Sequence, residues 1–221
     1  MAYPLKLAIC VLFGYLLGSL SPSALLSKLK KTDLRSGGSG NLGATNTMLV
    51  MGKAYGALVL VFDLAKGFFA VKIPGWVFPG AAYVGLAAGA AAVFGHVFPF
   101  YLKFKGGKGL AAYAGMILGA DPLLFLVLAV IAFILIFAVN YSAAMPMYGA
   151  LAFPVCYGVK HGDLIGACVC AAAGVLIVVT HFGNVLKAAR GEDYRIRQYF
   201  AEHFLKKKKP DAPSGEQENN S

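Results

Sequence analysis

Charge, and acidic charge above all, is what this 221-residue chain has least of. Only 14% of its residues are charged and 58% are hydrophobic, with a mean hydropathy of +0.68. This composition excludes an ordinary soluble globular domain. The 10 acidic residues are outnumbered by 20 lysines and arginines, a balance that would suggest a nucleic-acid partner only in a soluble protein. The sequence therefore predicts a polytopic membrane protein with no nucleic-acid partner.

Cysteine is also scarce, and its placement excludes two kinds of site. The four cysteines, at positions 10, 156, 168 and 170, all lie in apolar runs. The close pair has neither metal-site spacing nor histidine partners nearby. The cysteines are interpreted as small core residues, and no metal site, redox centre or cofactor is expected.

Seven apolar segments in the first 194 residues predict an all-α integral membrane domain. A helix needs about 20 apolar residues to cross a bilayer, and some of these segments are shorter. They cover residues 5–27, 48–72, 81–98, 110–119, 123–139, 147–159 and 164–180, with a turn at residues 74–80. Residues 195–221 include four consecutive lysines and a polar end that cannot bury a core, so a basic, disordered tail is expected.

The positions of the basic residues predict the orientation of these helices. With the N-terminus outside and the segments alternating, all but four of the 20 lysines and arginines fall on the cytoplasmic side. The exceptions are Lys6, Lys72 and Lys160 outside and Lys66 within the membrane. Because cytoplasmic loops carry an excess of Lys and Arg, the N-terminus is predicted outside and the C-terminus in the cytoplasm.

A basic, glycine-rich turn between two apolar segments is called the cradle below; it reads Phe104-Lys105-Gly106-Gly107-Lys108-Gly109. Consecutive glycines allow backbone N–H groups to converge on an anion, and the lysines add positive charge. The turn therefore predicts a phosphate site. It lacks the spacing of a nucleotide-binding P-loop. An ordinary cytoplasmic loop with positive-inside lysines is the alternative.

Two further polar clusters are predicted on the same side. Residues 36–46, rich in Gly and Ser, form a second candidate anion or hydroxyl site, with a flexible linker as the alternative. The third cluster follows the last apolar segment and consists of His181, Asn184, Lys187, Arg190, Gly191 and Glu192. Three polar clusters at one membrane face favour a shared site over three unrelated loops.

Asp63, Lys66 and His96 are ionisable residues in the interior of the apolar segments. Asp63 and Lys66 are three residues apart on one helical face, where a structural ion pair is favoured over a transport or catalytic role. His96 could orient the cradle, but a lone histidine beside Phe98 and Pro99 is more often a packing residue.

Taken together, three stretches resemble the signature motifs of the bacterial acyl-phosphate:glycerol-3-phosphate acyltransferases. They are Gly38-Ser39-Gly40-Asn41-Leu42-Gly43-Ala44-Thr45-Asn46, the cradle, and His181-x-x-Asn184 with Glu192. The resemblance implies a seven-helix enzyme of the bacterial inner membrane with its active site facing the cytoplasm. Such an enzyme transfers a fatty acyl group from acyl phosphate to glycerol-3-phosphate and gives lysophosphatidic acid for phospholipid synthesis.

The resemblance also implies roles for individual residues. The catalytic residues would be Ser39, Lys108, His181 and Asn184, and the substrate phosphate would contact Arg35, Lys105, Gly106, Gly107 and Gly109. The substrate or its loops would be supported by Asn41, Thr45, Asn46 and Ser142, and the structure by Asp63, Lys66 and Glu192. The implied partners are acyl phosphate, glycerol-3-phosphate and membrane lipid.

The chain departs from the family pattern at three places. Leu49 stands where an arginine is common, three residues after Ala-Thr-Asn, and Ala112 stands where a threonine is common. A hinge on the fifth span is altered in residues 139–144. The loss of an anion-binding arginine bears directly on the use of the family's usual substrates.

No histidine in the chain is followed by an aspartate five residues later, so the His-x-x-x-x-Asp base of soluble glycerolipid acyltransferases is absent. An acyl phosphate needs little proton chemistry, because its leaving group is a stable anion. Either His181 or the donor phosphate could take the proton of the glycerol hydroxyl, and the donor phosphate is slightly preferred. The alternative function is a transporter or channel for a small phosphorylated solute, gated by Asp63 and Lys66, although no internal repeat is visible.

Overall fold

The computed structural model describes residues 1–192, and its elements are helices. In chain order they are α1 (Tyr3–Ser19), α2 (Pro22–Leu29), α3 (Ala44–Met51), α4 (Lys53–Val77), α5 (Val84–Val97), the 3₁₀ helix η1 (Phe100–Leu102), α6 (Leu110–Ala120), α7 (Pro122–Val139), α8 (Ala144–His161) and α9 (Leu164–Ala189). The predicted tail, residues 195–221, lies outside the described residues.

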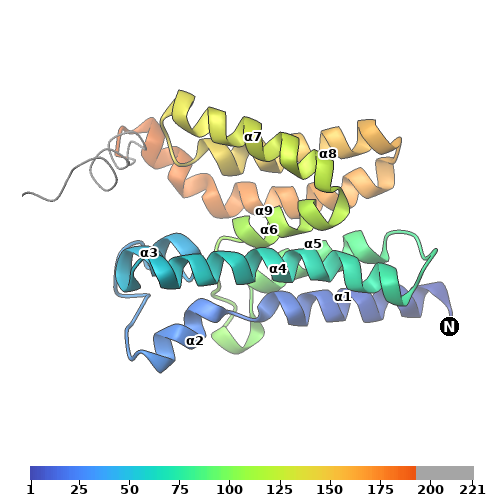
Figure 1. Ribbon diagram of the computed structural model, residues 1–221, viewed down its shortest axis with the longest axis horizontal. Coiled ribbons are helices and arrows are strands. Elements are labelled where there is room, and N and C mark those ends of the chain that lie inside the picture. Colours follow the sequence, from blue (N-terminus) through green and yellow to red (C-terminus); the bar gives the residue numbers. More distant parts are fainter. Residues whose placement is uncertain (193–221) are drawn as a thin grey trace, which may run out of the picture.

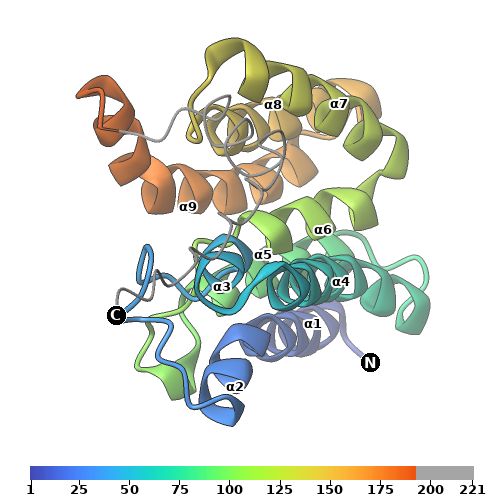
Figure 2. The ribbon, with the colours of Figure 1, turned by 60° about the vertical axis from the view of Figure 1, so that its left-hand side comes forward.

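The long helices form two groups that lie side by side (Figures 1 and 2). In the first group α1 packs on α5, and α4 packs on α5 and α6. In the second group α8 packs on both α7 and α9. The groups meet where α5 and α6 contact α9 and where α6 continues into α7. Tyr113 of α6 and Phe153 of α8, both fully buried, meet edge to face between the groups.

Within the described residues 1–192, four segments are long and apolar enough to cross a membrane: Tyr3–Leu29, Val84–Leu102, Pro122–Val139 and Leu164–Ala189. The apolar helix Leu110–Ala120 is shorter, as the sequence predicted for its fourth segment. The number of crossings and their orientation stay predictions.

The first predicted span, residues 5–27, lies within the candidate span Tyr3–Leu29, but two helices and not one make up this segment. The chain leaves α1 at Leu20, and α2 starts at Pro22. Proline lacks the N–H needed to continue a helix but fits a first turn, and the Ser21 hydroxyl accepts a hydrogen bond from the Ala24 N–H.

The second predicted span is also divided, and it ends later than expected. Gly52 separates α3 from α4, because its φ of +98° is not helical. Few residues other than glycine adopt that conformation. At its other end α4 continues through Pro74 and Gly75, where a turn was predicted. The proline costs one hydrogen bond near the helix end, and the Phe78 N–H still donates to the Pro74 carbonyl at 2.9 Å.

The last helix is longer than predicted. It runs to Ala189, so His181, Asn184 and Lys187 lie on its final turns and not after it. Beyond it the Glu192 N–H donates to the Lys187 carbonyl at 2.9 Å, which closes the helix end. The other segments agree with the predicted ones to within about three residues at each end, the usual spread of boundary assignment.

Only some of the cysteines are the buried core residues that the sequence predicted. Cys10 and Cys170 are buried, whereas Cys168 is exposed on α9. All four thiols are free.

Candidate active site

The three predicted polar clusters meet at one end of the bundle. That end carries α2, α3 and the C-terminal turns of α9, as the left side of Figure 1 shows. The N-terminus of α1 lies at the opposite end (Figure 1). Contacts between side chains and backbone connect the clusters in sequence, from the first to the cradle and from the cradle to α9.

Asn46 organises the first cluster from within. Its side chain is buried, and its Oδ1 accepts a hydrogen bond from the Ser39 N–H at 2.6 Å. Its Nδ2 donates to the Leu34 carbonyl at 2.7 Å. The loop is therefore folded around one amide, with the exposed Ser39 side chain at its surface. Thr45 is exposed and Asn41 half-buried beside Gly43.

Arg35 connects the first cluster to the cradle. A guanidinium nitrogen donates to the Lys105 carbonyl at 2.5 Å, across 70 residues of chain. This bond fixes the Arg35 side chain to the backbone of the cradle. The first cluster also reaches Gly107, since a Cβ built on that glycine would lie 2.6 Å from the Leu42 carbonyl.

Two glycines of the cradle bond to the backbone of α5. The Gly106 N–H donates to the Val97 carbonyl at 2.9 Å and the Gly107 N–H to the His96 carbonyl at 3.1 Å. These two N–H groups therefore satisfy the C-terminal carbonyls of α5. The assignment of Gly106 and Gly107 to the phosphate site stays a prediction. Glycine is needed at both positions because their backbone lies so close to His96 that a Cβ on either residue would overlap it.

Lys108 connects the cradle to the third cluster. Its Nζ donates to Asn184 Oδ1 at 2.7 Å, and the Thr180 hydroxyl donates to its carbonyl at 2.9 Å. Sequence reasoning missed the contact of Thr180 with Lys108, because Thr180 was counted as the end of the last span. Its position beside His181 was the only signal for it. Gly109, with φ +87°, then begins α6 in a conformation that favours glycine.

His181 is buried on α9 beside these contacts, only 5% exposed. Its Nδ1 lies 3.0 Å from the Ile177 carbonyl. A carbonyl can only accept, so Nδ1 carries the hydrogen in the neutral ring and Nε2 is left as the acceptor nitrogen. A ring held in this tautomer has the right form for a general base at Nε2.

Several predicted residues lie apart from this set of contacts. Asp63 and Lys66 are inside the bundle and form the expected pair, 2.8 Å apart. Ser142 lies in the connection between α7 and α8. Of the departures, Leu49 is exposed on α3, whereas Ala112 is buried where Gly67 of α4 approaches α6.

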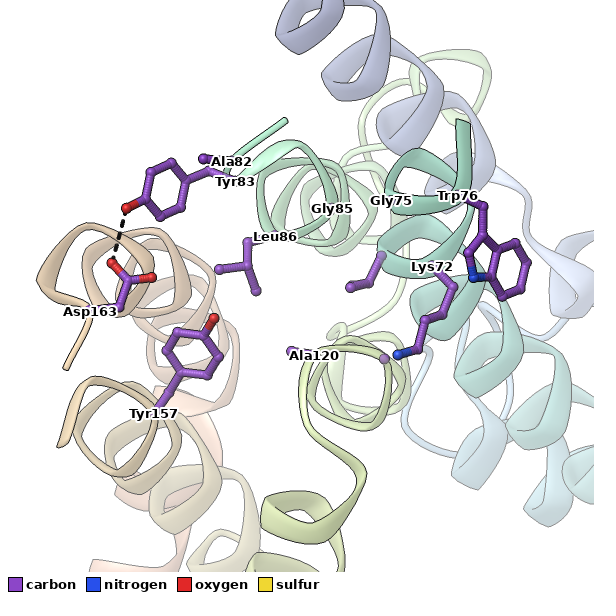
Figure 3. Close-up of a pocket in the computed structure, with 12 residues that line it drawn as sticks. Lys72, Gly75, Trp76, Ala82, Tyr83, Gly85, Leu86, Ala120, Tyr157 and Asp163 are labelled. Carbon is purple, nitrogen blue, oxygen red and sulfur yellow. Dashed lines mark hydrogen bonds between the residues drawn. The ribbon is translucent and has the colours of Figure 1, made fainter. Parts of the chain in front are cut away.

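Two cavities lie at opposite ends of the molecule. One, of about 400 Å³, is next to the three clusters and includes the basic side chains of Lys28, Lys31 and Arg35 in its lining. The other, of about 470 Å³, lies at the far end, between Tyr83 and Asp163 on one side and Lys72 and Trp76 on the other (Figure 3). It contains none of the predicted site residues, so size alone does not locate the site.

Comparison with known proteins identifies the family. A family model described as glycerol-3-phosphate acyltransferase matches residues 8–191. The chain belongs to this acyltransferase family. The glycerol-3-phosphate acyltransferase of Staphylococcus saprophyticus is 36% identical over 201 residues, which cover 87% of this chain and 99% of the relative. The enzyme of the same name from Macrococcus caseolyticus is 36% identical over 197 residues, covering 87% and 98%.

Solved structures of the family agree with the fold. The crystal structure of PlsY (YgiH), an integral membrane glycerol 3-phosphate acyltransferase in its glycerol 3-phosphate form, superimposes with a TM-score of 0.77 and 30% identity. It covers 89% of this chain and 98% of that one. Membership of the glycerol-3-phosphate acyltransferase family confirms the resemblance and the prediction of an all-α integral membrane protein. Membership of this enzyme family favours an acyltransferase over the transporter alternative.

Proposed function

We propose that this protein transfers a fatty acyl group from acyl phosphate to glycerol-3-phosphate and releases lysophosphatidic acid. The observation that carries the proposal is the connection of three basic and polar clusters through two contacts, Arg35 to Lys105 and Lys108 to Asn184. These contacts hold the side chains of Arg35 and Lys108 at the cradle, at one end of an otherwise apolar bundle. The related PlsY structures, in glycerol 3-phosphate and lysophosphatidic acid forms, are consistent with such a substrate and product.

The chemistry asks the protein chiefly to position two anions. A glycerol hydroxyl oxygen attacks the acyl carbonyl carbon, an ester bond forms, and the anhydride bond to phosphate breaks. The departing phosphate keeps the bonding electron pair and is a stable anion. The side chains of Arg35, Lys105 and Lys108 would supply the positive charge, since the N–H groups of Gly106 and Gly107 are engaged within the protein.

The hydroxyl proton has two possible acceptors. His181 Nε2 has the tautomer that a base requires, but the ring is almost fully buried. The donor phosphate carries its own basic oxygens and arrives beside the hydroxyl by necessity. We therefore assign the proton to the phosphate, with His181 and Asn184 orienting the substrate.

One assay tests the proposed reaction. The purified full-length protein is incubated with radiolabelled glycerol-3-phosphate and either acyl phosphate or acyl-CoA. We expect labelled lysophosphatidic acid with acyl phosphate and none with acyl-CoA. Product formed from acyl-CoA alone would refute the proposed donor.

His181→Gln tests the proton assignment. A histidine acting as general base typically supplies a factor of about 10²–10⁴ in rate, whereas a residue that only orients substrate can be partly replaced. We expect His181→Gln to keep measurable turnover. A fall in kcat of more than about three orders of magnitude, with glycerol-3-phosphate binding intact, would make His181 the base.

The proposed setting is the bacterial cell membrane, with the site facing the cytoplasm. A reporter fused after Ser221 should then be active in the cytoplasm, and cysteines placed near Pro79 or Gly162 should react with an impermeant label from outside. External labelling of a cysteine at Gly38 would contradict this orientation.

A further inference from the structure

A buried cluster of three ionisable side chains lies next to the cradle. Asp63 and Lys66 of α4 and His96 of α5 are at most 8% exposed. Lys66 Nζ lies 2.8 Å and His96 Nδ1 3.4 Å from the same oxygen, Asp63 Oδ1. Charged groups inside a membrane bundle are expensive, and apolar residues of similar volume often serve stability as well. Stability alone is therefore a weak reason for this cluster.

The other side of the His96 ring faces the cradle. A Cβ built on Gly107 would overlap His96 Nε2, so the imidazole lies directly against the Gly107 backbone. The His96 carbonyl also accepts the Gly107 N–H, at 3.1 Å. One residue thus holds Gly107 through its backbone and limits its position through its side chain.

Lys66 extends the cluster to the break between α1 and α2. Its Nζ donates to the Leu20 carbonyl at 2.7 Å. The same break is held by Tyr101, just before the cradle, whose hydroxyl donates to the Ser19 carbonyl at 2.8 Å and accepts the Ser21 N–H at 3.1 Å. The start of the cradle segment is therefore fastened to α1 and α4 by polar contacts that end at the cluster.

We infer that His96 is a positioning residue of the acyl-transfer site. Its buried ring, whose Nδ1 lies 3.4 Å from Asp63, sets the place of Gly107, and hence of Lys108 in its contact with Asn184. Asp63 and Lys66 act through His96 and do not touch substrate. The inference rests on the proposed function for its kinetic consequences only, because placement of Lys108 also affects the binding of glycerol-3-phosphate.

Two substitutions at this position test the inference in the full-length protein. His96→Asn retains a polar atom near Asp63 but does not reach Gly107, whereas His96→Gln extends toward the place of Nε2. Small misplacements in a site can cost up to about 10²-fold in rate. We expect His96→Asn to lower kcat/KM for glycerol-3-phosphate roughly 10- to 100-fold, mainly through KM, and His96→Gln to recover part of the loss.

His161 provides the matched control. It belongs to a similar set at the far end, where its Nε2 lies 2.9 Å from Asp121 Oδ2 and Lys160 binds the same oxygen. His161→Asn should change the melting temperature without changing kcat/KM. Equal kinetic losses in the two asparagine variants would refute a positioning role specific to His96.

Binding of glycerol-3-phosphate, measured by calorimetry without any acyl donor, gives a second readout. His96→Asn should weaken it about tenfold at an unchanged fold. Wild-type affinity and wild-type kcat/KM in a folded His96→Asn protein would overturn the inference. Absence of turnover in the wild type would instead count against the proposed function, and the binding series would still decide on His96.

A double substitution serves if His96→Asn does not fold. Gly107→Ala places its Cβ against both His96 Nε2 and the Leu42 carbonyl, and the flexible Gln side chain of His96→Gln can yield to it at the first contact only. We expect Gly107→Ala to cost less affinity in the His96→Gln background than in the wild type. Strictly additive losses would mean that the two residues do not act through their contact.

Discussion

The two groups of helices are packed by different means. In the first group, a Cβ on Gly14 or Gly18 of α1 would overlap the backbone of α5, and one on Gly115 of α6 would overlap that of α4. In the second group, Gly149 and Gly183 have no neighbouring atom within 4 Å of such a Cβ. The first group is held by backbone-to-backbone contact, which the second uses only where Gly174 meets Ala150.

This difference explains how the site is built. Lipid tails are as apolar as leucine, so helices in a membrane associate through close packing of small residues. The closely packed group carries the first cluster and the cradle, and the second group adds His181 and Asn184. Helix α7, which buries only Leu124, Leu128 and Ala132, leaves most of its surface for lipid. The site therefore lies at the seam between a tightly packed scaffold and a looser layer.

The largest effect is expected from breaking the tight group. Gly115→Ala would drive a methyl group into the Leu64 carbonyl, so α4 and α6 must separate, at a cost of about 3 kcal/mol. Thermal unfolding in detergent measures this loss of stability. Gly149→Ala on α8 is the matched control and should be neutral or stabilising by up to about 1 kcal/mol. Similar destabilisation by both changes would remove the distinction between the groups.

The next effect concerns the seam itself. Lys108→Ala removes a charge-assisted hydrogen bond to Asn184 and a cation of the proposed phosphate site, worth about 1.5–3 kcal/mol, or roughly 10- to 100-fold in kcat/KM. Steady-state kinetics with varied glycerol-3-phosphate measure the loss. Lys103→Ala, an exposed lysine before the cradle, should leave kcat/KM unchanged. Wild-type kinetics for Lys108→Ala would mean that the cradle is an ordinary basic loop and not a phosphate site.

A smaller effect is expected at the far end, within the looser group. Burial acts to raise the pKa of Asp121, but hydrogen bonds from the Leu124 N–H, Lys160 and His161 outweigh it and lower the pKa from 3.8 to about 2. The folded carboxyl is the stronger acid, so its stabilisation is complete above about pH 4 and is lost as the pH falls toward 2. Asp121→Asn should flatten the dependence of the melting temperature on pH between about pH 4 and pH 2, the window that the two pKa values define. An equally steep acid decline in the variant would show that other carboxyls control it.

The smallest effect is expected from a single contact between the groups. Tyr83 of α5 donates to Asp163 Oδ1, before α9, at 3.2 Å. Tyr83→Phe should lower stability by about 0.5–1.5 kcal/mol and leave activity unchanged, because the contact lies at the end away from the cradle. A large loss of activity would indicate that the far end controls the seam.

Prediction from the sequence succeeded where the membrane restricts the possibilities. A loop between spans can lie on only two sides, so the placement of basic residues was enough to bring the three clusters to one end. It could not find the Arg35 and Thr180 contacts to cradle carbonyls, which depend on how residues far apart in the chain are packed. The sequence did not show the break before Pro22 inside the first span, and it misjudged the second span, which Gly52 divides and Pro74 does not end.

By itself, then, the sequence determined a helical membrane protein of this acyltransferase family and most of the residues that meet at its site. Only the tertiary structure decided what those residues do locally. Gly106 and Gly107 looked suited to bind a phosphate, but the end of α5 lies so close that their N–H groups bond to its carbonyls. His96 looked like packing, but it lies between Asp63 and Gly107. The reason is physical: a residue type limits which contacts are possible, and the distance to a neighbour remote in the chain selects among them.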